Sequence, residues 1–181
     1  MKDKQTGTKN TVLNNEELLQ SIMTFAREFK AHSRGFGSNR LKQSGAVLLF
    51  SGGSGTRKTM AAELLAKQLG KPLKRIDLSG IISKYIGETE KNLNRILSEA
   101  EKSDYILLFD EADALFGKRS QVRDAHDRYA NQAVSFLLTK LESYNGLAIL
   151  STNLKTKIDS AFLRRIHSVI KFPCFGDDEE E

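Results

Sequence analysis

Short apolar runs alternate with longer amphipathic stretches along most of this chain. Where such a run has no polar position, as in Ala46-Val-Leu-Leu-Phe50, it predicts a strand that is buried on both faces. The longer stretches place apolar residues three and four positions apart, which predicts helices that bury one side. Strands alternating with helices favour an α/β fold with a doubly wound, mostly parallel sheet of five strands. The predicted strands are 46–50, 73–78, 105–109, 147–150 and 168–172, and the predicted helices begin at Asn15 and span 58–68, 88–102, 129–143 and about 159–165.

Length and composition are those of a single globular domain. The chain has 181 residues, enough to bury a sizeable core, and its hydrophobic share of 39% is typical of folded domains. No apolar run approaches the roughly 20 residues that cross a bilayer, and the N-terminus lacks the apolar stretch of a secretory signal. Cys174 is the only cysteine, which excludes an internal disulfide and fits a reducing, cytoplasmic compartment with no membrane contact.

The net charge of +5 raises the question of nucleic-acid binding, because basic surfaces attract phosphates. The basic residues are scattered rather than gathered in one block, as Lys67, Lys71, Lys74 and Arg75 illustrate. We interpret this interleaving as a solvated surface, and nucleic acid is not expected as a partner.

A glycine-rich stretch lies between the strand at 46–50 and the helix at 58–68. Its sequence, Gly52-Gly-Ser-Gly-Thr-Arg-Lys-Thr59, follows the phosphate-binding pattern G-x-x-x-x-G-K-[ST] except at its second glycine. Glycines let backbone N–H groups curl around an anion, and the helix that follows offers its positive N-terminal end. Lys58 would reach the β- and γ-phosphates of a nucleotide, and the Thr59 hydroxyl would ligate Mg²⁺.

Arg57 stands where the pattern has its second glycine. A glycine at this position keeps the backbone close to the phosphates, whereas a Cβ and a long side chain crowd that path. The positive charge of arginine does not restore the missing space. Weakened or lost ATP binding is therefore an alternative that the sequence leaves open.

Two acidic residues, Asp110 and Glu111, directly follow the most strand-like apolar run. Ligands of open parallel sheets bind beyond the carboxyl ends of the strands, so these side chains are expected close to the glycine-rich loop. Asp110 would hold Mg²⁺ through water, and Glu111 would polarise the attacking water as a general base. The alternative is that the two acidic residues only cap the next helix.

Polar residues at two later positions suit the same reaction. Asn153 follows the strand at 147–150, and its amide can hydrogen-bond both the γ-phosphate and the attacking water; an ordinary turn asparagine is the alternative. Arg164 and Arg165 lie on the predicted helix at 159–165, and their guanidinium groups suit a transferring phosphoryl group. Surface arginines would show the same spacing, so both interpretations remain open for this pair.

Taken in order, these motifs resemble those of the AAA+ ATPase family, and the resemblance covers about Asn15 to Phe175. It implies the P-loop NTPase fold, a three-layer αβα sandwich, with ATP and Mg²⁺ as cofactors. Members normally continue into a small helical lid after the last strand, and that lid is expected to be absent here. The likeness lies in 52–59 (Walker A), 106–111 (Walker B), 147–153 (the sensor-1 strand), 161–165 (the arginine-finger segment) and 83–91 (the first pore loop of classical AAA unfoldases and severing enzymes). Two further runs, 110–119 and 126–131, look closest to the AAA ATPases encoded with phage-tail-like contractile injection systems.

The resemblance also implies roles for single residues and for partners. Arg164 and Arg165 would act in trans on a neighbour's nucleotide, so hydrolysis would require a homo-oligomeric ring, typically a hexamer. Tyr85, with Ile86 and Gly87, would face a central channel and grip a protein substrate; a half-buried aromatic is the alternative for Tyr85. The nucleotide would contact Gly52, Gly53, Ser54, Gly55, Thr56, Arg57, Lys58, Thr59 and Met60, the last of these near its base.

The leading hypothesis is an AAA+ core at residues 15–175, between a flexible segment at 1–14 and an acidic tail at 176–181. This core would hydrolyse ATP and thereby drive remodelling or unfolding of a protein in an oligomeric ring. The alternative is a degenerate or truncated AAA+ module, a nucleotide-binding or assembly scaffold with little turnover because of Arg57. A third hypothesis is a DNA-associated AAA+ loader, which requires salt-sensitive DNA binding.

Overall fold

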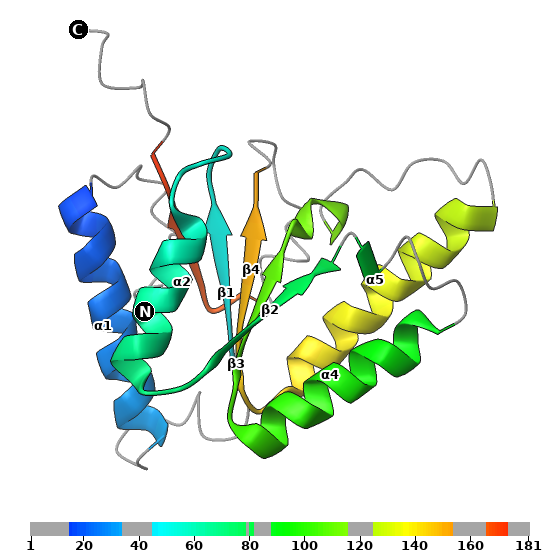
Figure 1. Cartoon of the computed structure of the whole chain (residues 1–181), viewed down its shortest axis with the longest axis horizontal. Coiled ribbons are helices and arrows are strands. Elements are labelled where there is room, and N and C mark those ends of the chain that lie inside the picture. The colour runs from blue at the N-terminus through cyan, green and yellow to red at the C-terminus, as the bar shows by residue number, and fades with distance from the viewer. Residues whose placement is uncertain are drawn as a thin grey trace, which may run out of the picture.

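The fold is built on one sheet with helices on both of its faces (Figure 1). The structure, a computed structural model, describes residues 15–33, 45–78, 80–81, 88–115, 125–153 and 166–173. The strands are β1 (Ala46–Ser51), β2 (Leu73–Asp77), β3 (Ile106–Asp110), β4 (Leu147–Thr152) and β5 (Ser168–Lys171). The helices are α1 (Asn15–Ser33), α2 (Lys58–Leu69), α4 (Thr89–Ser103), α5 (Ala125–Ser143) and the short 3₁₀ helix η1 (Ala112–Leu115).

The five strands lie in the order β2-β3-β4-β1-β5, and each pairing is parallel. Helices α1 and α2 cover one face of the sheet, and α4 and α5 cover the other (Figure 1). The predicted α/β fold is therefore confirmed as a three-layer αβα sandwich with a parallel five-stranded sheet. None of the helices in the described ranges is long and apolar enough to cross a membrane.

Within the described residues, the predicted strands and helices are confirmed with small shifts at their ends. Helix α5 begins at Ala125 rather than at Tyr129, because a polar first turn gives no hydrophobic periodicity to read. Helix η1, directly after β3, was not predicted, since four residues are too few to show a period. The predicted helix at 159–165 and the segments 1–14 and 176–181 lie outside the described residues.

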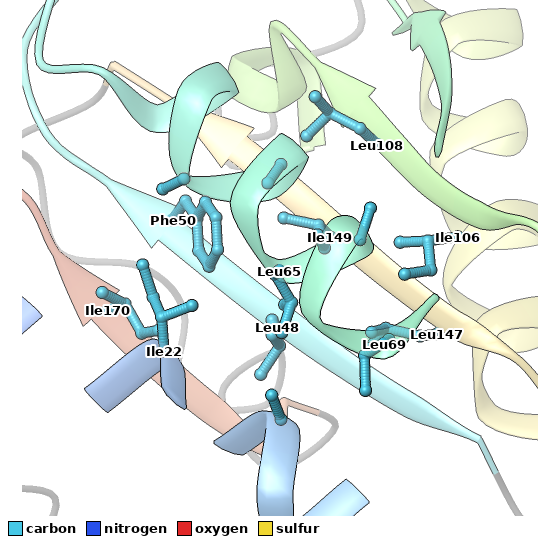
Figure 2. Close-up of a cluster of buried hydrophobic side chains, with 14 of the residues drawn as sticks. Ile22, Leu48, Phe50, Leu65, Leu69, Ile106, Leu108, Leu147, Ile149 and Ile170 are labelled. Atoms are coloured by element: carbon cyan, nitrogen blue, oxygen red, sulfur yellow. The ribbon is translucent and has the colours of Figure 1, made fainter. Parts of the chain in front are cut away.

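Both faces of the central strands are buried. Along β1, Leu48 and Phe50 face α1 and α2, while Val47 and Leu49 face α4 and α5. Figure 2 shows the cluster of buried side chains on the face covered by α1 and α2, in which Leu65 from α2 and side chains from α1 pack onto β1 and β4. Successive side chains of a strand point to opposite faces, and here helices cover both faces. Every position is therefore buried, and full burial of a leucine or phenylalanine side chain stabilises the fold by about 2 kcal/mol, which explains the uninterrupted apolar runs.

The parallel arrangement gathers three turns at one edge of the sheet. Strands β3, β4 and β1 are neighbours, and their carboxyl ends lie at Asp110, Thr152 and Ser51. The glycine-rich loop, the acidic pair and Asn153 therefore lie at or directly after the ends of adjacent strands. We call this side of the sheet the carboxyl edge.

Candidate functional site

The glycine-rich loop is held at its start between two neighbouring strand ends. The Gly52 N–H donates to the Thr152 carbonyl (3.2 Å), and the Phe172 N–H donates to the Ser51 carbonyl (2.7 Å). A Cβ on Gly52 would lie 2.8 Å from both the Cβ and the carbonyl oxygen of Phe172. Only glycine fits this close approach, so packing alone requires the first glycine of the pattern.

Arg57 adopts the left-handed backbone conformation, with φ 62° and ψ 20°. It is the residue before α2, and its carbonyl accepts the N–H of Ala61 (3.0 Å) at the start of that helix. A non-glycine residue in this conformation costs about 1–2 kcal/mol. The structure thus adds a second reason for the glycine of the pattern, because the position requires a positive φ in addition to space.

The ammonium group of Lys58 is folded into the loop, and the residue is only 7% exposed. Its Nζ donates to the carbonyls of Gly52 and Gly53 (2.7 Å each), to Thr56 Oγ1 (3.2 Å) and to Asn153 Oδ1 (2.9 Å). Such a buried charge is tolerated because oxygen atoms replace its water. The lysine that the pattern assigns to phosphate contact is thus held by oxygen atoms of the loop and of Asn153.

Asn153 lies beside the loop although it is 95 residues away from Lys58 in the chain. It comes directly after β4, which pairs with β1 along its whole length, and its side-chain oxygen accepts from Lys58. The predicted meeting of the loop and this strand end is thus present in the fold.

The Asp110 carboxylate ends β3 and is 16% exposed. Its Oδ1 accepts the backbone N–H of Glu111 (3.0 Å), and its Oδ2 accepts a short hydrogen bond from the Arg75 guanidinium. Glu111 has φ 52°, so a second non-glycine residue of the predicted site is in the left-handed region. Sequence reasoning treated Arg75 as solvated surface; its side chain is exposed, but it is paired with Asp110.

Asp113 is a residue of this edge that sequence reasoning missed. Its Oδ1 accepts from the Thr152 hydroxyl (2.5 Å) and from the Asn153 N–H (2.9 Å). Thr152 is fully buried, so this carboxylate ties the turn after β3 to the end of β4. An acidic residue three positions after Asp110 was the available signal, but a short polar turn would carry the same residue.

An apolar cavity of about 370 Å³ adjoins the loop between α1 and α2. Small-molecule sites commonly have this size and an apolar lining. Met60, which is 63% exposed, lines this cavity, and its place near a nucleotide base stays a prediction. The lining residues are Leu18, Leu19, Ile22, Arg57, Met60, Ala61, Leu64 and Phe172.

The donor set suits a magnesium ion that arrives with a nucleotide. In the described part of the chain, no three His, Cys, Asp or Glu side chains converge on one point. Magnesium is usually held by one or two protein groups together with phosphate oxygens. Asp110 at the end of β3 and half-buried Thr59 in the first turn of α2 are the groups that fit this role.

The remaining predicted site residues lie outside the described ranges. These are the arginine pair Arg164 and Arg165, and the pore-loop residues Tyr85, Ile86 and Gly87. Their roles stay predictions.

Sequence comparisons place this chain among ATPases. The model of the "ATPase family associated with various cellular activities (AAA)" matches residues 48–174. An uncharacterized AAA family ATPase, y4kL of Sinorhizobium fredii, is 30% identical over 170 residues, which are 91% of this chain and 49% of that protein. The vesicle-fusing ATPase of Arabidopsis thaliana is 36% identical over 141 residues, covering 68% of this chain and 18% of that protein. The 26S proteasome subunit RPT4 of Saccharomyces cerevisiae is 31% identical over 140 residues (74% and 32%). The chain thus spans half or less of these relatives.

Solved structures share the fold. The FIGL-1 AAA domain in complex with ADP superposes with a TM-score of 0.65 and 21% identity, covering 94% of this chain and 56% of that chain. A second structure of the FIGL-1 AAA domain gives 0.67 and 22%, covering 90% and 56%. At this identity the likeness concerns the architecture.

Proposed function

Because its family model matches residues 48–174, the chain belongs to the AAA family of ATPases. We propose that it binds ATP with Mg²⁺ and hydrolyses ATP to ADP and phosphate. The observation that carries this proposal is the hydrogen bond between Lys58 Nζ and Asn153 Oδ1. It joins the predicted phosphate-binding cation to the predicted γ-phosphate sensor.

Binding would begin at the loop. The backbone N–H groups of 52–57 and the N-terminus of α2 would hold the β- and γ-phosphates. Lys58 would exchange some of its contacts with the Gly52 and Gly53 carbonyls for phosphate oxygens. The adenine base would occupy the apolar cavity beside Met60, where a flat, weakly polar ring gains from leaving water.

Hydrolysis would use the turns after β3 and β4. Magnesium, when bound, neutralises charge that builds up on the phosphate oxygens, and Thr59 and Asp110 would hold it. Glu111 would take a proton from the attacking water, and the Asn153 amide would orient that water against the γ-phosphate. The new bond joins the water oxygen to the γ-phosphorus, and the bond to the β-γ bridging oxygen breaks, so ADP and phosphate leave.

We further propose that the domain works in a homo-oligomeric ring, a hexamer, that remodels a protein. Support comes from the relatives, which include vesicle-fusing ATPases and a 26S proteasome subunit. Arg164 and Arg165 would complete a neighbour's site, and Tyr85, Ile86 and Gly87 would contact the protein substrate. A cytoplasmic location and kinship with the ATPases of phage-tail-like contractile injection systems complete this proposal, the latter supported by the sequence runs 110–119 and 126–131.

A scaffold with little turnover is the second candidate, and Arg57 is the observation that favours it. Arg57 has a strained backbone at φ 62° and a long side chain, and it occupies the position where nucleotide-binding loops of this pattern have glycine. In that case the chain would assemble with partners while hydrolysing little ATP.

Calorimetric binding and turnover of ATP·Mg²⁺ separate the two candidates. We expect the wild type to bind and hydrolyse ATP, and Glu111→Gln to keep binding while losing about 10²–10⁴-fold in turnover. Binding without turnover in the wild type would favour a nucleotide-binding scaffold, and no binding at all would contradict ATP hydrolysis and favour an assembly scaffold.

Arg57→Gly and Arg57→Ala form a matched pair for the loop. Both variants remove the charge, but only glycine also removes the Cβ and the strain at positive φ. We expect Arg57→Gly to bind ATP·Mg²⁺ more tightly than Arg57→Ala. Equal affinities would show that the missing glycine does not limit binding.

A further inference from the structure

Arg75 reaches Asp110 from the side of β3 that faces away from the glycine-rich loop. Arg75 lies on β2, which pairs with β3 in the register Arg75 to Leu108 and Asp77 to Asp110. Strand β2 is the outermost strand next to β3, whereas β1 and its loop lie beyond β4 on the other side of β3 (Figure 1). The strand that carries Arg75 and the strand that carries the loop therefore lie on opposite sides of β3 and its Asp110.

Two donors from different parts of the chain hold the two oxygens of Asp110. Arg75 donates to Oδ2, and the backbone N–H of Glu111 donates to Oδ1. A carboxylate with a donor on each oxygen has little freedom to rotate about its last side-chain bond. Arg75 is 63% exposed while Asp110 is 16% exposed, so an exposed cation compensates a carboxylate that has lost most of its water.

We propose that Arg75 is a positioning residue for Asp110, which it orients toward the magnesium ion of the bound nucleotide. This inference rests on the proposed ATP·Mg²⁺ site. Carboxylates that bind metals are themselves hydrogen-bonded, and loss of such a partner typically weakens metal affinity about 10–100-fold. Arg75 would act only through Asp110, because its strand lies on the far side of β3 from the loop.

The Mg²⁺ requirement of ADP binding tests this role without any measurement of turnover. ADP is titrated by calorimetry at increasing Mg²⁺ for the wild type, Arg75→Met and Arg75→Lys. We expect Arg75→Met to need at least about tenfold more Mg²⁺ for half-maximal binding. Arg75→Lys, which keeps a cationic donor but not the planar fork, should restore part of the difference. Binding of ADP without Mg²⁺ should be the same in all three proteins.

Lys74→Met is the matched control. Lys74 is the neighbouring residue on β2, but its Nζ pairs with Glu99 of α4 (2.8 Å) on the other face of the sheet. The variant removes one positive charge from the same strand without touching Asp110. We expect its Mg²⁺ requirement to equal that of the wild type; a shift as large as that of Arg75→Met would reduce the effect to net charge and overturn the proposal.

A double variant shows whether Arg75 acts through Asp110. In the Asp110→Asn background, Arg75→Met should add nothing further to the Mg²⁺ requirement. An unchanged requirement in the Arg75→Met single variant would overturn the proposal, and a lowered one would overturn it in favour of competition between Arg75 and the ion. If Arg75→Met does not fold, as judged by thermal unfolding, Arg75→Gln takes its place with the same expectation.

Failure of the proposed function would look different. If the wild type binds no ADP with or without Mg²⁺, the titrations are repeated in the Arg57→Gly background. Absence of binding there too would overturn the nucleotide site and this inference together. Binding that does not depend on Arg75 would overturn the inference alone.

Discussion

At the carboxyl edge of the sheet, polar side chains join turns that follow different strands, whereas at the opposite, amino edge backbone hydrogen bonds hold the chain where it enters β1. Lys58 joins the loop to Asn153, and Asp113 joins the turn after β3 to Thr152. At the amino edge, the Gly45 N–H donates to the Tyr144 carbonyl (2.8 Å), and the Ala46 N–H donates to the Gly146 carbonyl (2.9 Å). The same strands therefore begin in close backbone packing and end in a polar network.

Backbone strain shows the same division in part. Among the described residues, Arg57, Asp104 and Glu111 are the non-glycine residues with positive φ. Arg57 and Glu111 lie at the carboxyl edge, and Asp104 ends helix α4 as its C-cap. Strain of this kind persists where the surrounding structure enforces it, and it is often found at functional sites. We infer that changes at the amino edge cost stability, while changes at the carboxyl edge mainly cost binding.

Gly45→Ala should give the largest effect, and it acts on stability. A Cβ there would lie 1.9 Å from the Gly146 carbonyl oxygen and 2.5 Å from that of Tyr144, and backbone atoms cannot move aside cheaply. We expect a loss of about 3 kcal/mol or more in the free energy of unfolding, measured with urea. Gly70→Ala is the control, because a Cβ on Gly70 meets no atom within 4 Å and only the positive φ of 70° is penalised. That control should lose about 1 kcal/mol. Equal losses would contradict the close-packing account.

Lys58→Met should act mainly on nucleotide binding rather than on stability. The methionine keeps most of the buried aliphatic chain but removes the cation held by loop oxygens, so nucleotide affinity should fall about 10–100-fold. Lys67→Met, on the same helix but exposed, removes the same charge and should bind as the wild type does. The measurement is calorimetric binding of ATP·Mg²⁺, with thermal unfolding alongside. Unchanged affinity in Lys58→Met would contradict the placement of the phosphates.

Thr152→Val is a change at the carboxyl edge that should nevertheless lower stability. Thr152 lies at the carboxyl edge, yet its hydroxyl is fully buried and donates to the Asp113 carboxylate. Hydrogen bonds to charged groups contribute about 1.5–3 kcal/mol, so we expect a loss of about 2 kcal/mol in urea unfolding. Thr139→Val, at an exposed position on α5, is the matched control and should stay within about 0.5 kcal/mol. A loss at Thr152 no larger than that at Thr139 would show that the buried pair contributes little.

The sequence predicts the fold well because its central strands are buried on both faces. The apolar runs at Ala46–Phe50 and Leu147–Leu150 have no second interpretation at this length, and the glycine-rich pattern predicts the loop that connects β1 to α2. The meeting of Lys58 and Asn153 is also predictable, since parallel strands end at the same edge.

The contacts that the sequence did not predict depend on strand order and on backbone angles. The pairing of Arg75 with Asp110 requires that β2 lie next to β3, which no residue pattern specifies. The contact of Asp113 with Thr152 depends on a four-residue 3₁₀ turn that has no periodicity. For Arg57, the sequence pattern indicated a departure, but the positive φ that explains the glycine is visible only in the fold.

His167→Gln should give the smallest effect, and it appears only in the pH dependence of stability. His167 lies at the amino edge, where its Nδ1 accepts the Val47 N–H (3.0 Å) and its own backbone N–H donates to the Val47 carbonyl (2.8 Å). Loss of water around the ring lowers the pKa of His167 below its usual value, and protonation of Nδ1 would remove the acceptor.

Since the pKa of His167 is lower in the folded than in the unfolded chain, the unfolded chain binds more protons as the pH falls through about 6.5. The free energy of unfolding should therefore decrease with falling pH in the wild type and level off below the folded-state pKa. Glutamine cannot titrate, so the wild type should lose more stability than His167→Gln between about pH 8 and pH 5 in urea unfolding. The difference should be small because the ring is partly exposed. A stability difference between the two proteins that stays constant over this range would contradict any effect of the His167 charge on the amino edge.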